Sequence, residues 1–232
     1  MTTLIIATRN PHKVEEIRGI LGDAFEFLTL ERFAEAPLVL EDANTFGGNA
    51  TKKAVELARW LAIRHPRVST SATFVLADDS GLEVDALQGA PGIHSARFAA
   101  LDSGAARNSS DAENNAKLLR LLKDVPAEKR TARFRCVIAL AAVLAPATAN
   151  ASPVCEADER ELLTQLFDGA CEGKIMFTPS GRKGFGYDPL FVPDGFAQSF
   201  AELGEEVKNR ISHRAHALKK LREYFSEADL KR

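Results

Sequence analysis

The chain has 232 residues, 45% of them hydrophobic, which is enough apolar material to bury a substantial core. Its 30 Lys and Arg residues against 32 Asp and Glu leave a formal charge of −2, without the basic excess that attracts polymeric nucleic acid or anionic membranes. No apolar run approaches the roughly 20 residues of a membrane span, and the first residues lack the pattern of a signal peptide. We therefore expect one soluble, cytoplasmic domain over residues 1–232, with no nucleic-acid or membrane partner.

The cysteines and histidines predict neither a disulfide framework nor a zinc site. Cys136, Cys155 and Cys171 are widely spaced and form no Cys-x-x-Cys pair. The close pair His213 and His216 has no third ligand type beside it, whereas zinc sites need three or four ligands. We interpret the cysteines as structural thiols.

The first part of the chain predicts a strand, a loop and a helix. The apolar run 4–7 has the length of a buried strand, and the polar stretch 8–12 separates it from an amphipathic pattern at 13–21. A second helix is predicted to begin after Asn44 or Thr45 as its cap and to continue for about five turns.

The run 73–77 predicts another buried strand, which passes directly into Asp78-Asp79-Ser80-Gly81, a composition typical of a turn. Acidic groups are therefore expected at the carboxyl end of a strand. The later predicted elements are a loop at 89–92, a helix from about 110 to 123, a strand at 134–144, a surface loop at 145–152, a short strand at 190–192, and a closing helix with Ala217, Leu218, Leu221 and Tyr224 on its inner face. Interleaved strands and helices favour an α/β fold, with ligands where loops leave the strand ends.

The loop Thr8-x-Asn10-x-x-Lys13 lies between the first strand and the first helix. Backbone N–H groups, the helix dipole and a lysine can together hold a phosphate at such a place. The loop matches neither the Walker pattern nor Gly-x-Gly-x-x-Gly, and threonine and asparagine before a helix are commonly plain caps. Both interpretations stay open at this point.

Asp78 and Asp79 are adjacent carboxylates, which repel each other unless something positive lies nearby. A magnesium ion bridged to phosphate oxygens would compensate them, and Glu41 could supply another metal oxygen. The alternatives are a solvated acidic turn and, for Glu41, an ordinary surface acid.

Phe185-Gly186-Tyr187-Asp188 places an aromatic ring between glycines, so that the ring could stack on a base while the aspartate accepts from ring N–H groups. The alternative is a turn with a buried phenylalanine. The stretch 208–214, Lys-Asn-Arg-Ile-Ser-His-Arg, concentrates donors that could bind keto oxygens or phosphates. Its alternative is a solvated helix start with Ser212 as N-cap.

Six stretches in this order resemble the family of inosine and xanthosine triphosphate pyrophosphatases, and the match spans nearly the whole chain. Each stretch alone is a weak signal, but their ordered co-occurrence is highly specific. They are Ala7-Thr8-Arg9-Asn10-x-x-Lys13, Thr45-Phe46-x-x-Asn49-Ala50-x-x-Lys53-Ala54, Leu76-Ala77-Asp78-Asp79-Ser80-Gly81-Leu82, Gly89-Ala90-Pro91-Gly92-Ile93-x-Ser95-Ala96-Arg97-Phe98, Gly184-Phe185-Gly186-Tyr187-Asp188-Pro189 and Ile211-Ser212-His213-Arg214-Ala215.

The resemblance implies a single pyrophosphatase-like domain over residues 1–232. Its expected fold is an elongated α/β architecture, with a mixed central β-sheet flanked by helices, two lobes around a deep active-site cleft, and a homodimer. The implied activity is hydrolysis of the triphosphates of inosine, deoxyinosine and xanthosine (ITP, dITP and XTP) to the monophosphate and pyrophosphate. This reaction cleanses the nucleotide pool, so that these bases do not enter DNA or RNA.

Carried over residue by residue, the resemblance makes Asp79 the catalytic proton acceptor and places Mg²⁺ on Glu41 and Asp79. Whether Asp78 also contacts the metal stays open. The expected substrate contacts are Thr8, Arg9, Asn10, Pro11, His12 and Lys13 for the triphosphate, then Ser80, and around the base Phe185, Gly186, Tyr187, Asp188, Lys208, His213 and Arg214.

A mechanism follows from these roles as a hypothesis. A water activated by Asp79 or by the metal attacks the α-phosphorus and expels pyrophosphate, while Lys13 steadies the leaving charge. Donors from Lys208 or Arg214 suit the six-keto oxygen of inosine and xanthosine, whereas adenine offers an amino group there. Guanine also has a six-keto group, so its exclusion rests on the resemblance alone.

The chain departs from the family pattern at three places. Arg9 stands where a small residue, often glycine, is usual, and arginine takes positive φ less freely than glycine. The usual Glu-Thr-Gly before the second helix appears as Glu41-Asp42-Ala43, and Gly48 replaces a common glutamate. The stretches 64–72 and 145–168 are also divergent, which affects the expected oligomer contacts more than the chemistry.

Two other functional classes stay open beside this resemblance. A pyrophosphatase for modified pyrimidine or other nucleotides would share the phosphate loop and the carboxylates. A non-enzymatic nucleotide sensor would bind triphosphates without turnover. The Asp78-Asp79 pair argues against a sensor, because a binding protein gains little from an extra carboxylate near phosphates.

Overall fold

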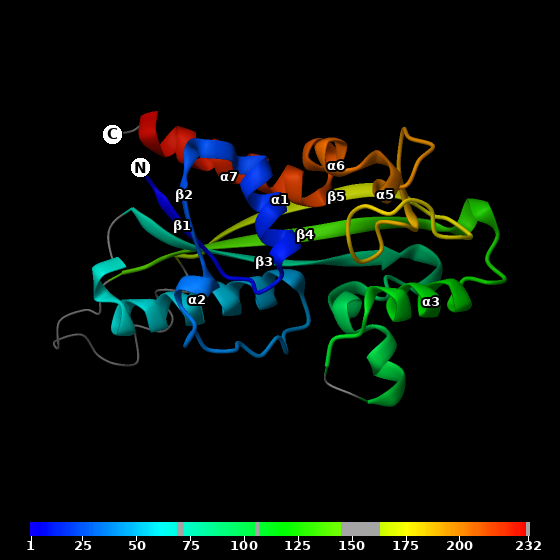
Figure 1. Ribbon diagram of the computed structural model, residues 1–232, viewed down its shortest axis with the longest axis horizontal. Helices are drawn as coiled ribbons and strands as arrows, with labels where there is room; N and C mark the ends of the chain where they lie inside the picture. The colour runs from blue at the N-terminus through cyan, green and yellow to red at the C-terminus, as the bar shows by residue number, and fades with distance from the viewer. Residues whose placement is uncertain (69–71, 105–106, 145–162, 231–232) are drawn as a thin grey trace. The chain divides into compact units, whose positions relative to one another are not determined.

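A computed structural model describes residues 1–68, 72–104, 107–144 and 163–230 (Figure 1). Its centre is a six-stranded sheet with the strand order β2-β1-β3-β4-β5-β6. β1 pairs in parallel with β2 and β3, while β5 pairs antiparallel with β6, so the sheet is mixed as predicted. The strands are β1 Thr3–Ile6, β2 Glu26–Thr29, β3 Thr73–Val84, β4 Thr131–Ala142, β5 Gln165–Ile175 and β6 Phe191–Pro193.

Helices flank this sheet and complete an α/β fold (Figure 1). The α-helices are α1 Pro11–Leu21, α2 Phe46–Arg64, α3 Asp111–Leu121, α5 Phe200–Leu203, α6 Glu205–Ile211 and α7 His213–Leu230. Short 3₁₀ helices lie at Gly22–Ala24, Leu30–Arg32, Pro66–Val68, Asp85–Leu87, Gly92–Arg97, Ala99–Ser103 and Ala127–Lys129. No helix among the described residues is long and apolar enough to cross a membrane.

The chain forms two compact units. The first unit consists of Met1–Asp79, Val137–Phe167 and Leu218–Arg232, and the second consists of Ser80–Cys136 and Asp168–Ala217. The strands β3, β4 and β5 and the helix α7 contribute residues to both units.

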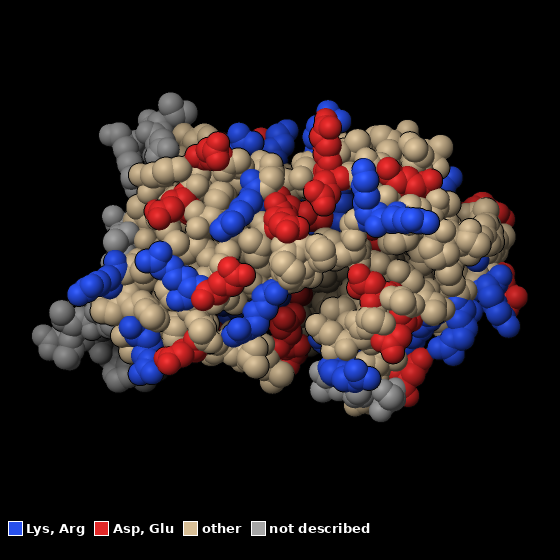
Figure 2. Space-filling view, viewed as in Figure 1, with Lys and Arg blue, Asp and Glu red and all other residues tan. Residues whose placement is uncertain are grey.

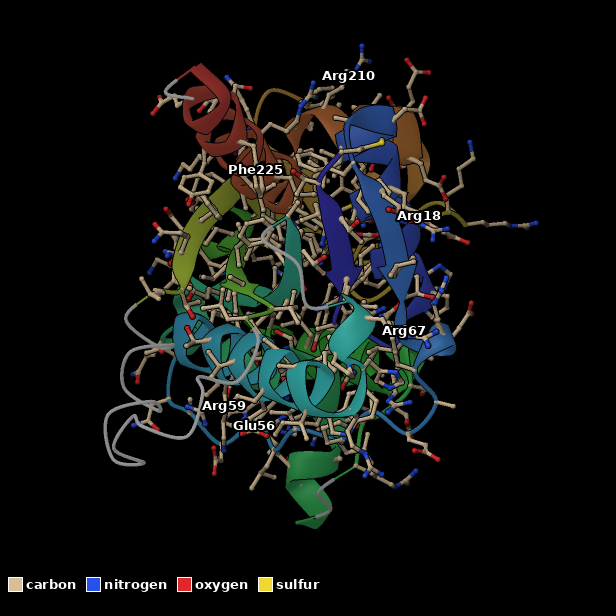
Figure 3. The ribbon with its side chains drawn as sticks, turned by 90° about the vertical axis from the view of Figure 1, so that its left-hand side faces the viewer. Arg18, Glu56, Arg59, Arg67, Arg210 and Phe225 are labelled. Atoms are coloured by element: carbon tan, nitrogen blue, oxygen red, sulfur yellow. The ribbon has the colours of Figure 1, made fainter. Side chains whose placement is uncertain are left out.

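The core of the first unit is built around β1. Leu4, Ile5 and Ile6 are all buried, which is the burial expected when both faces of a parallel strand are covered. α2 covers one face of the sheet and α1 the other (Figure 1). Seen from the end of the sheet, Glu56 and Arg59 lie on the outer side of α2 (Figure 3).

The closing helix α7 differs from the prediction at one residue. Leu218 and Leu221 are fully buried as expected, but Tyr224 is 37% exposed. The inward aromatic position belongs to its neighbour Phe225, whose ring lies 5.2 Å from that of Phe25 and 5.4 Å from that of Phe74 (Figure 3). The prediction of Tyr224 as an inner-face residue was therefore wrong.

The prediction of a turn at Asp78-Asp79-Ser80-Gly81 was also wrong, because these residues lie inside β3. Local composition indicated a turn, but pairing with the neighbouring strands overrides it. β1 is paired with β3 only as far as Ile6, which lies opposite Leu76. The two aspartates therefore lie in β3 just beyond the point where its pairing with β1 ends, and β3 itself continues past them to Val84.

The second unit has its own apolar core. Phe134, Phe191 and Phe200 pack together, with ring centres 4.7 to 6.2 Å apart. The buried guanidinium of Arg130 donates to three backbone carbonyls, among them that of Leu122 at the end of α3. The apolar core of this unit therefore contains a cluster of aromatic rings, and the Arg130 guanidinium binds a carbonyl at the end of α3.

The remaining predicted elements are confirmed with small shifts. α3 begins after Ser110, the long strand β4 runs over residues 131–142 rather than 134–144, and the predicted loop covers residues 89–91, because Gly92 begins a 3₁₀ helix. The predicted loop 145–152 and Cys155 lie outside the described residues. Cys136 and Cys171 are buried free thiols.

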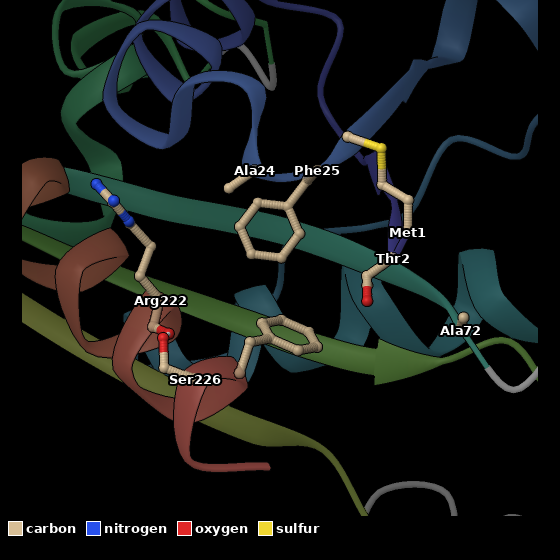
Figure 4. A pocket seen from close by; sticks show the side chains of 8 residues that line it. Met1, Thr2, Ala24, Phe25, Ala72, Arg222 and Ser226 are labelled. Carbon is tan, nitrogen blue, oxygen red and sulfur yellow. The ribbon is translucent and has the colours of Figure 1, made fainter. Parts of the chain in front are cut away.

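The surface in Figure 2 carries Lys and Arg interspersed with Asp and Glu. A cavity of about 360 Å³ opens in the first unit (Figure 4). It is lined by Met1, Thr2, Ala24, Phe25, Ala72, Arg222, Phe225 and Ser226, and none of these is a predicted site residue.

Candidate functional site

The predicted phosphate loop is a capped helix start. Asn10 is the N-cap of α1, and its side-chain oxygen accepts from the backbone N–H of His12 at 2.9 Å and of Lys13 at 3.4 Å. Thr8 Oγ1 accepts from the Asn10 N–H at 3.2 Å, and Pro11 occupies the first helical position. The cap interpretation is therefore confirmed, and the cap fixes the shape of the loop that a phosphate would meet.

Arg9 does not distort this loop. The one non-glycine residue with positive φ in the described part of the chain is Gln88, so Arg9 keeps an ordinary backbone conformation. Its guanidinium donates to the carbonyl of Ala36 at 2.9 Å. The arginine therefore ties the loop to the segment that leads to Glu41, and the family's usual glycine is not needed for the backbone here.

Asp78 and Asp79 are both buried and are bonded to different helices. Neighbouring residues of a strand project to opposite faces of a sheet, so the two carboxylates diverge. Asp78 forms an ion pair with Lys13 of α1. Asp79 bonds instead to Asn49 and Lys53 of α2. The two carboxylates thus form direct ion pairs with different lysines.

Lys53 gathers the two predicted metal ligands. Its ammonium nitrogen lies 3.1 Å from Asp79 Oδ1, 3.4 Å from Glu41 Oε2 and 2.8 Å from the carbonyl oxygen of Asp78. We had assigned no role to Lys53 from the sequence. Its position in a matched stretch, four residues after Asn49 on one face of α2, was the available signal.

Asn49 is the second residue that the sequence reasoning missed. It is 1% exposed, donates to Asp79 Oδ2 at 3.2 Å, and accepts from the Ala43 N–H at 2.9 Å. One side chain therefore joins Asp79 to the segment that carries Glu41.

Burial raises the pKa of Asp79 to about 6, and Glu41 adds to this shift, while Lys53 and Lys13 oppose it. Burial also disfavours the charge on Lys53, but the carboxylates of Asp79, Glu41 and Asp78 outweigh it and raise the pKa of that ammonium. The negative charge of this cluster is therefore incompletely compensated, which favours the approach of a further cation.

The donor set is suited to a hard cation. Glu41 and Asp79 offer carboxylate oxygens, the ligands that magnesium prefers. Over the described residues, no three His, Cys, Asp or Glu side chains are grouped to hold a metal ion. Magnesium commonly uses one or two carboxylates together with substrate phosphates, and Glu41 and Asp79 could supply those two carboxylates.

Residues 184–188 form a loop in the second unit, called the aromatic loop below, and a buried ion pair supports it. Asp188 is 1% exposed, and its Oδ2 accepts from Lys208 Nζ at 2.6 Å and from the Phe185 N–H at 2.9 Å. The same ammonium lies 4.4 Å from the centre of the Phe185 ring, within cation–π distance. Gly184 has positive φ, and a Cβ there would collide with the Asp188 carboxylate. The loop therefore needs glycine at this position.

Tyr187 and Asp188 were predicted to contact the base, and that role stays a prediction. Both side chains are buried and bonded within the protein. The Tyr187 hydroxyl donates to the Ser95 carbonyl at 2.9 Å, and burial raises its pKa, with a smaller effect from Asp111.

The donor stretch 208–214 joins α6 to α7. Ser212 Oγ accepts from the Ala215 N–H at 3.2 Å, so the predicted capping role of this serine is confirmed. Arg214 is 1% exposed and donates to Ser80 Oγ at 3.0 Å. The His213 ring stacks on Phe134 with 4.8 Å between ring centres. The structure thus brings together two predicted site residues, Ser80 and Arg214.

An α/β sheet with oxygen ligands beside a strand-to-helix loop defines a class of proteins that handle phosphorylated small molecules. The comparison with family models narrows the class. The model of the Ham1 family matches residues 4–224, and the chain belongs to this family.

Relatives and solved structures agree with this membership. The chain is 44% identical to a dITP/XTP pyrophosphatase of Desulforamulus reducens, over 96% of this chain and 95% of the relative. It is 43% identical to one of Geobacter sulfurreducens, over 97% of each. The structure of a HAM1 protein from Coxiella burnetii matches with a TM-score of 0.74 and 32% identity, covering 98% of this chain and 100% of that one. A nucleoside-triphosphatase / dITP/XTP pyrophosphatase from Mycobacterium abscessus matches with a TM-score of 0.65 and 36% identity, covering 95% and 98%.

Proposed function

We propose that this protein hydrolyses non-standard purine nucleoside triphosphates, those of inosine, deoxyinosine and xanthosine, to the monophosphate and pyrophosphate. The observation that carries the proposal is the convergence of Glu41 and Asp79 on the Lys53 ammonium. The similarity to dITP/XTP pyrophosphatases supports the substrate class. Removal of these nucleotides from the pool would keep their bases out of DNA and RNA.

The first unit would bind the triphosphate. Lys13 supplies positive charge at the start of α1, and the cap on Asn10 holds the backbone of this loop in one shape. Binding to phosphate oxygens would draw the Lys13 ammonium away from Asp78. Lys53 would offset the charge of the carboxylates that must lie close to the phosphates.

Glu41 and Asp79 would hold magnesium, which when bound neutralises the triphosphate and polarises its phosphoryl groups. Asp79 would accept the proton of the attacking water at its carboxylate. The water oxygen forms a bond to the α-phosphorus, the bond from the α-phosphorus to the bridging oxygen breaks, and pyrophosphate leaves with that electron pair.

The second unit would bind the base. We propose that the base stacks on Phe185, whose ring already lies against the Lys208 ammonium. Arg214 and Lys208 are donors, which suit the six-keto oxygen of the non-standard purines and leave adenine's amino group without an acceptor. Ser80, held by Arg214, would contact the substrate from β3.

Substitution of Asp79 tests the catalytic part of this proposal. We expect Asp79→Asn to lower kcat on inosine triphosphate by about 10²- to 10⁴-fold, because it removes the proton acceptor and one metal oxygen. Asp124→Asn is the matched control, because this aspartate is exposed on the surface and should keep wild-type turnover. An Asp79→Asn enzyme with near wild-type kcat would exclude Asp79 as the acceptor.

The quaternary structure and location are further proposals drawn from the family resemblance. We propose that residues 1–232 form one pyrophosphatase-like domain, which assembles as a homodimer and acts in the cytoplasm. Sedimentation equilibrium would test the dimer, and a monomer at micromolar concentration would contradict it.

A further inference from the structure

Both backbone polar groups of Gly186 are held by side chains of α3. Its N–H donates to Asp111 Oδ2 at 2.6 Å, and its carbonyl accepts from Asn115 Nδ2 at 2.9 Å. Asp111 and Asn115 are four residues apart and therefore lie on one face of the helix. Gly186 directly follows Phe185, so α3 grips the loop beside its aromatic ring.

These two hydrogen bonds fix both polar groups of the Gly186 backbone. The residue has a φ of 63°, a conformation that glycine adopts readily. A Cβ at this position would meet no atom within 4 Å. Close packing is therefore not what requires glycine here, and loss of either hydrogen bond would remove one restraint on the loop, which Asp188 also holds through the Phe185 N–H.

The helix that provides this grip is itself anchored. Asn114 is 3% exposed, accepts from the Ala99 N–H at 2.8 Å, and donates to the Ala96 carbonyl at 3.3 Å. The Ser95 carbonyl of the same segment accepts from the Tyr187 hydroxyl. The matched stretch 89–98, to which the sequence reasoning gave no role, thus supports the aromatic loop twice, through α3 and through Tyr187.

We propose that Asp111 and Asn115 are positioning residues for the base, which set nucleobase affinity by holding Gly186 and thereby the Phe185 ring. The inference rests on the proposed function, in which Phe185 stacks on the base. It assigns the two side chains no contact with the phosphates or the reacting atoms. Their loss should therefore weaken binding of the base and leave the chemical step unchanged.

Two substitutions each remove one of these hydrogen bonds. Asn115→Asp places a carboxylate oxygen against the Gly186 carbonyl in place of the amide donor. Asp111→Ala removes the acceptor, whereas Asp111→Asn keeps a side-chain oxygen for the Gly186 N–H and should restore binding. The matched control is Glu113→Ala, because Glu113 forms the capping box with Ser110 at the start of α3 but does not contact the loop.

The experiment compares one ligand that has a base with one that has none. We would measure KM and kcat for inosine triphosphate, together with the inhibition constants of inosine monophosphate and pyrophosphate. For Asn115→Asp and Asp111→Ala we expect KM and the inosine monophosphate constant to rise about fivefold or more, the effect of one lost hydrogen bond. The pyrophosphate constant, kcat, and every constant of Asp111→Asn and Glu113→Ala should stay within about twofold of wild type.

Three results would overturn the inference. The first is unchanged inosine monophosphate binding in both Asn115→Asp and Asp111→Ala. The second is an equal weakening of pyrophosphate binding in these variants. The third is an equal weakening in Glu113→Ala, which would show that the effect comes from the stability of α3. A wild-type protein that fails to hydrolyse inosine triphosphate would overturn the proposed function and this inference with it. An active wild type with unaffected variants would overturn the inference alone.

Discussion

The carboxylate cluster of the first unit and the aromatic loop of the second are held in different ways. Two side chains of α2, the cation Lys53 and the neutral amide Asn49, hold Asp79. Hydrogen bonds between side chains and the backbone, together with glycine conformations, hold the loop around Phe185, and the buried pair of Lys208 and Asp188 supports it. The contacts of the carboxylate cluster determine the charge around Asp79, whereas the contacts of the aromatic loop determine the shape of the backbone around Phe185. Substitutions in the first should therefore change turnover, and those in the second should change stability or affinity.

After Asp79→Asn, the largest expected kinetic effect is that of Lys53→Met. The variant keeps the length of the side chain but leaves Glu41 and Asp79 without their shared ammonium. We expect kcat on inosine triphosphate to fall about 100-fold, the scale of losing one preorganised charge at a reacting centre. The ratio of kcat/KM between inosine and adenosine triphosphates should stay constant, since the base is bound elsewhere. A changed ratio with intact kcat would contradict the assignment of charge to one cluster and shape to the other.

The second expected effect concerns folding stability. Lys208→Met removes the ammonium beside the buried Asp188 carboxylate, which should lower the free energy of unfolding by about 3–5 kcal/mol. The double variant Lys208→Met/Asp188→Leu removes both charges and should recover most of this loss. Urea denaturation measures both. If the single variant is as stable as wild type, the buried pair does not support the loop.

A third effect, about 1–3 kcal/mol, concerns the segment before α2. A Cβ at Gly48 would lie only 2.8 Å from the Cβ of Ala43. The family's usual glycine and glutamate thus appear here as Ala43 and Gly48, with the small residue exchanged across one contact. Gly48→Glu alone should destabilise the protein and raise the magnesium requirement, because the Glu41 segment must shift.

The double variant Ala43→Gly/Gly48→Glu relieves this collision and allows a capping box with Thr45. A double-mutant cycle should show a coupling free energy of about 1 kcal/mol or more, and additive effects would refute the exchange.

The smallest expected effect is on thiol reactivity in the second unit. Burial raises the pKa of Cys171 to about 12, with smaller contributions from Asp194 and Glu172, so its thiolate is scarce at pH 8. Cys136 is fully buried. In a Cys155→Ser background, a disulfide reagent at pH 8 should label neither thiol in the native protein and both after unfolding. Fast labelling of the native protein would show that this unit opens readily.

The sequence predicted elements best where local chemistry decides them. Asn10 and Thr45, which the sequence offered as caps, each precede a helix in the structure, and the helix predicted from about residue 110 begins after Ser110. Side-chain hydrogen bonds to the first turn determine such starts within a few residues. The local sequence was therefore sufficient to locate the starts of these helices.

β5 was missed because its pattern is hidden by glycines. Its buried positions include Gly169 and Gly173, so the alternation lacks apolar residues where a strand should show them. A Cβ at Gly169 would collide with the backbone of α7, and one at Gly173 with that of β6. Only the tertiary structure reveals these close approaches.

The site was predicted in its residues more than in its connections. The paired acids predicted a metal site. Their side chains lie on two faces of β3, however, and this could not be predicted because the local composition indicated a turn instead of a strand. Lys53 and Asn49 were in view as matched residues, yet their contacts with Asp79 depend on how α2 packs against the sheet. Pairwise contacts of this kind have no local sequence signal.

One measurement tests the proposed activity most directly. The protein is incubated with magnesium and, separately, with inosine, xanthosine, guanosine, adenosine and thymidine triphosphates, and the phosphorus products are identified by ³¹P NMR. The account predicts monophosphate and pyrophosphate from the first two substrates and little product from the others. Release of orthophosphate, or equal hydrolysis of adenosine and inosine triphosphates, would contradict it.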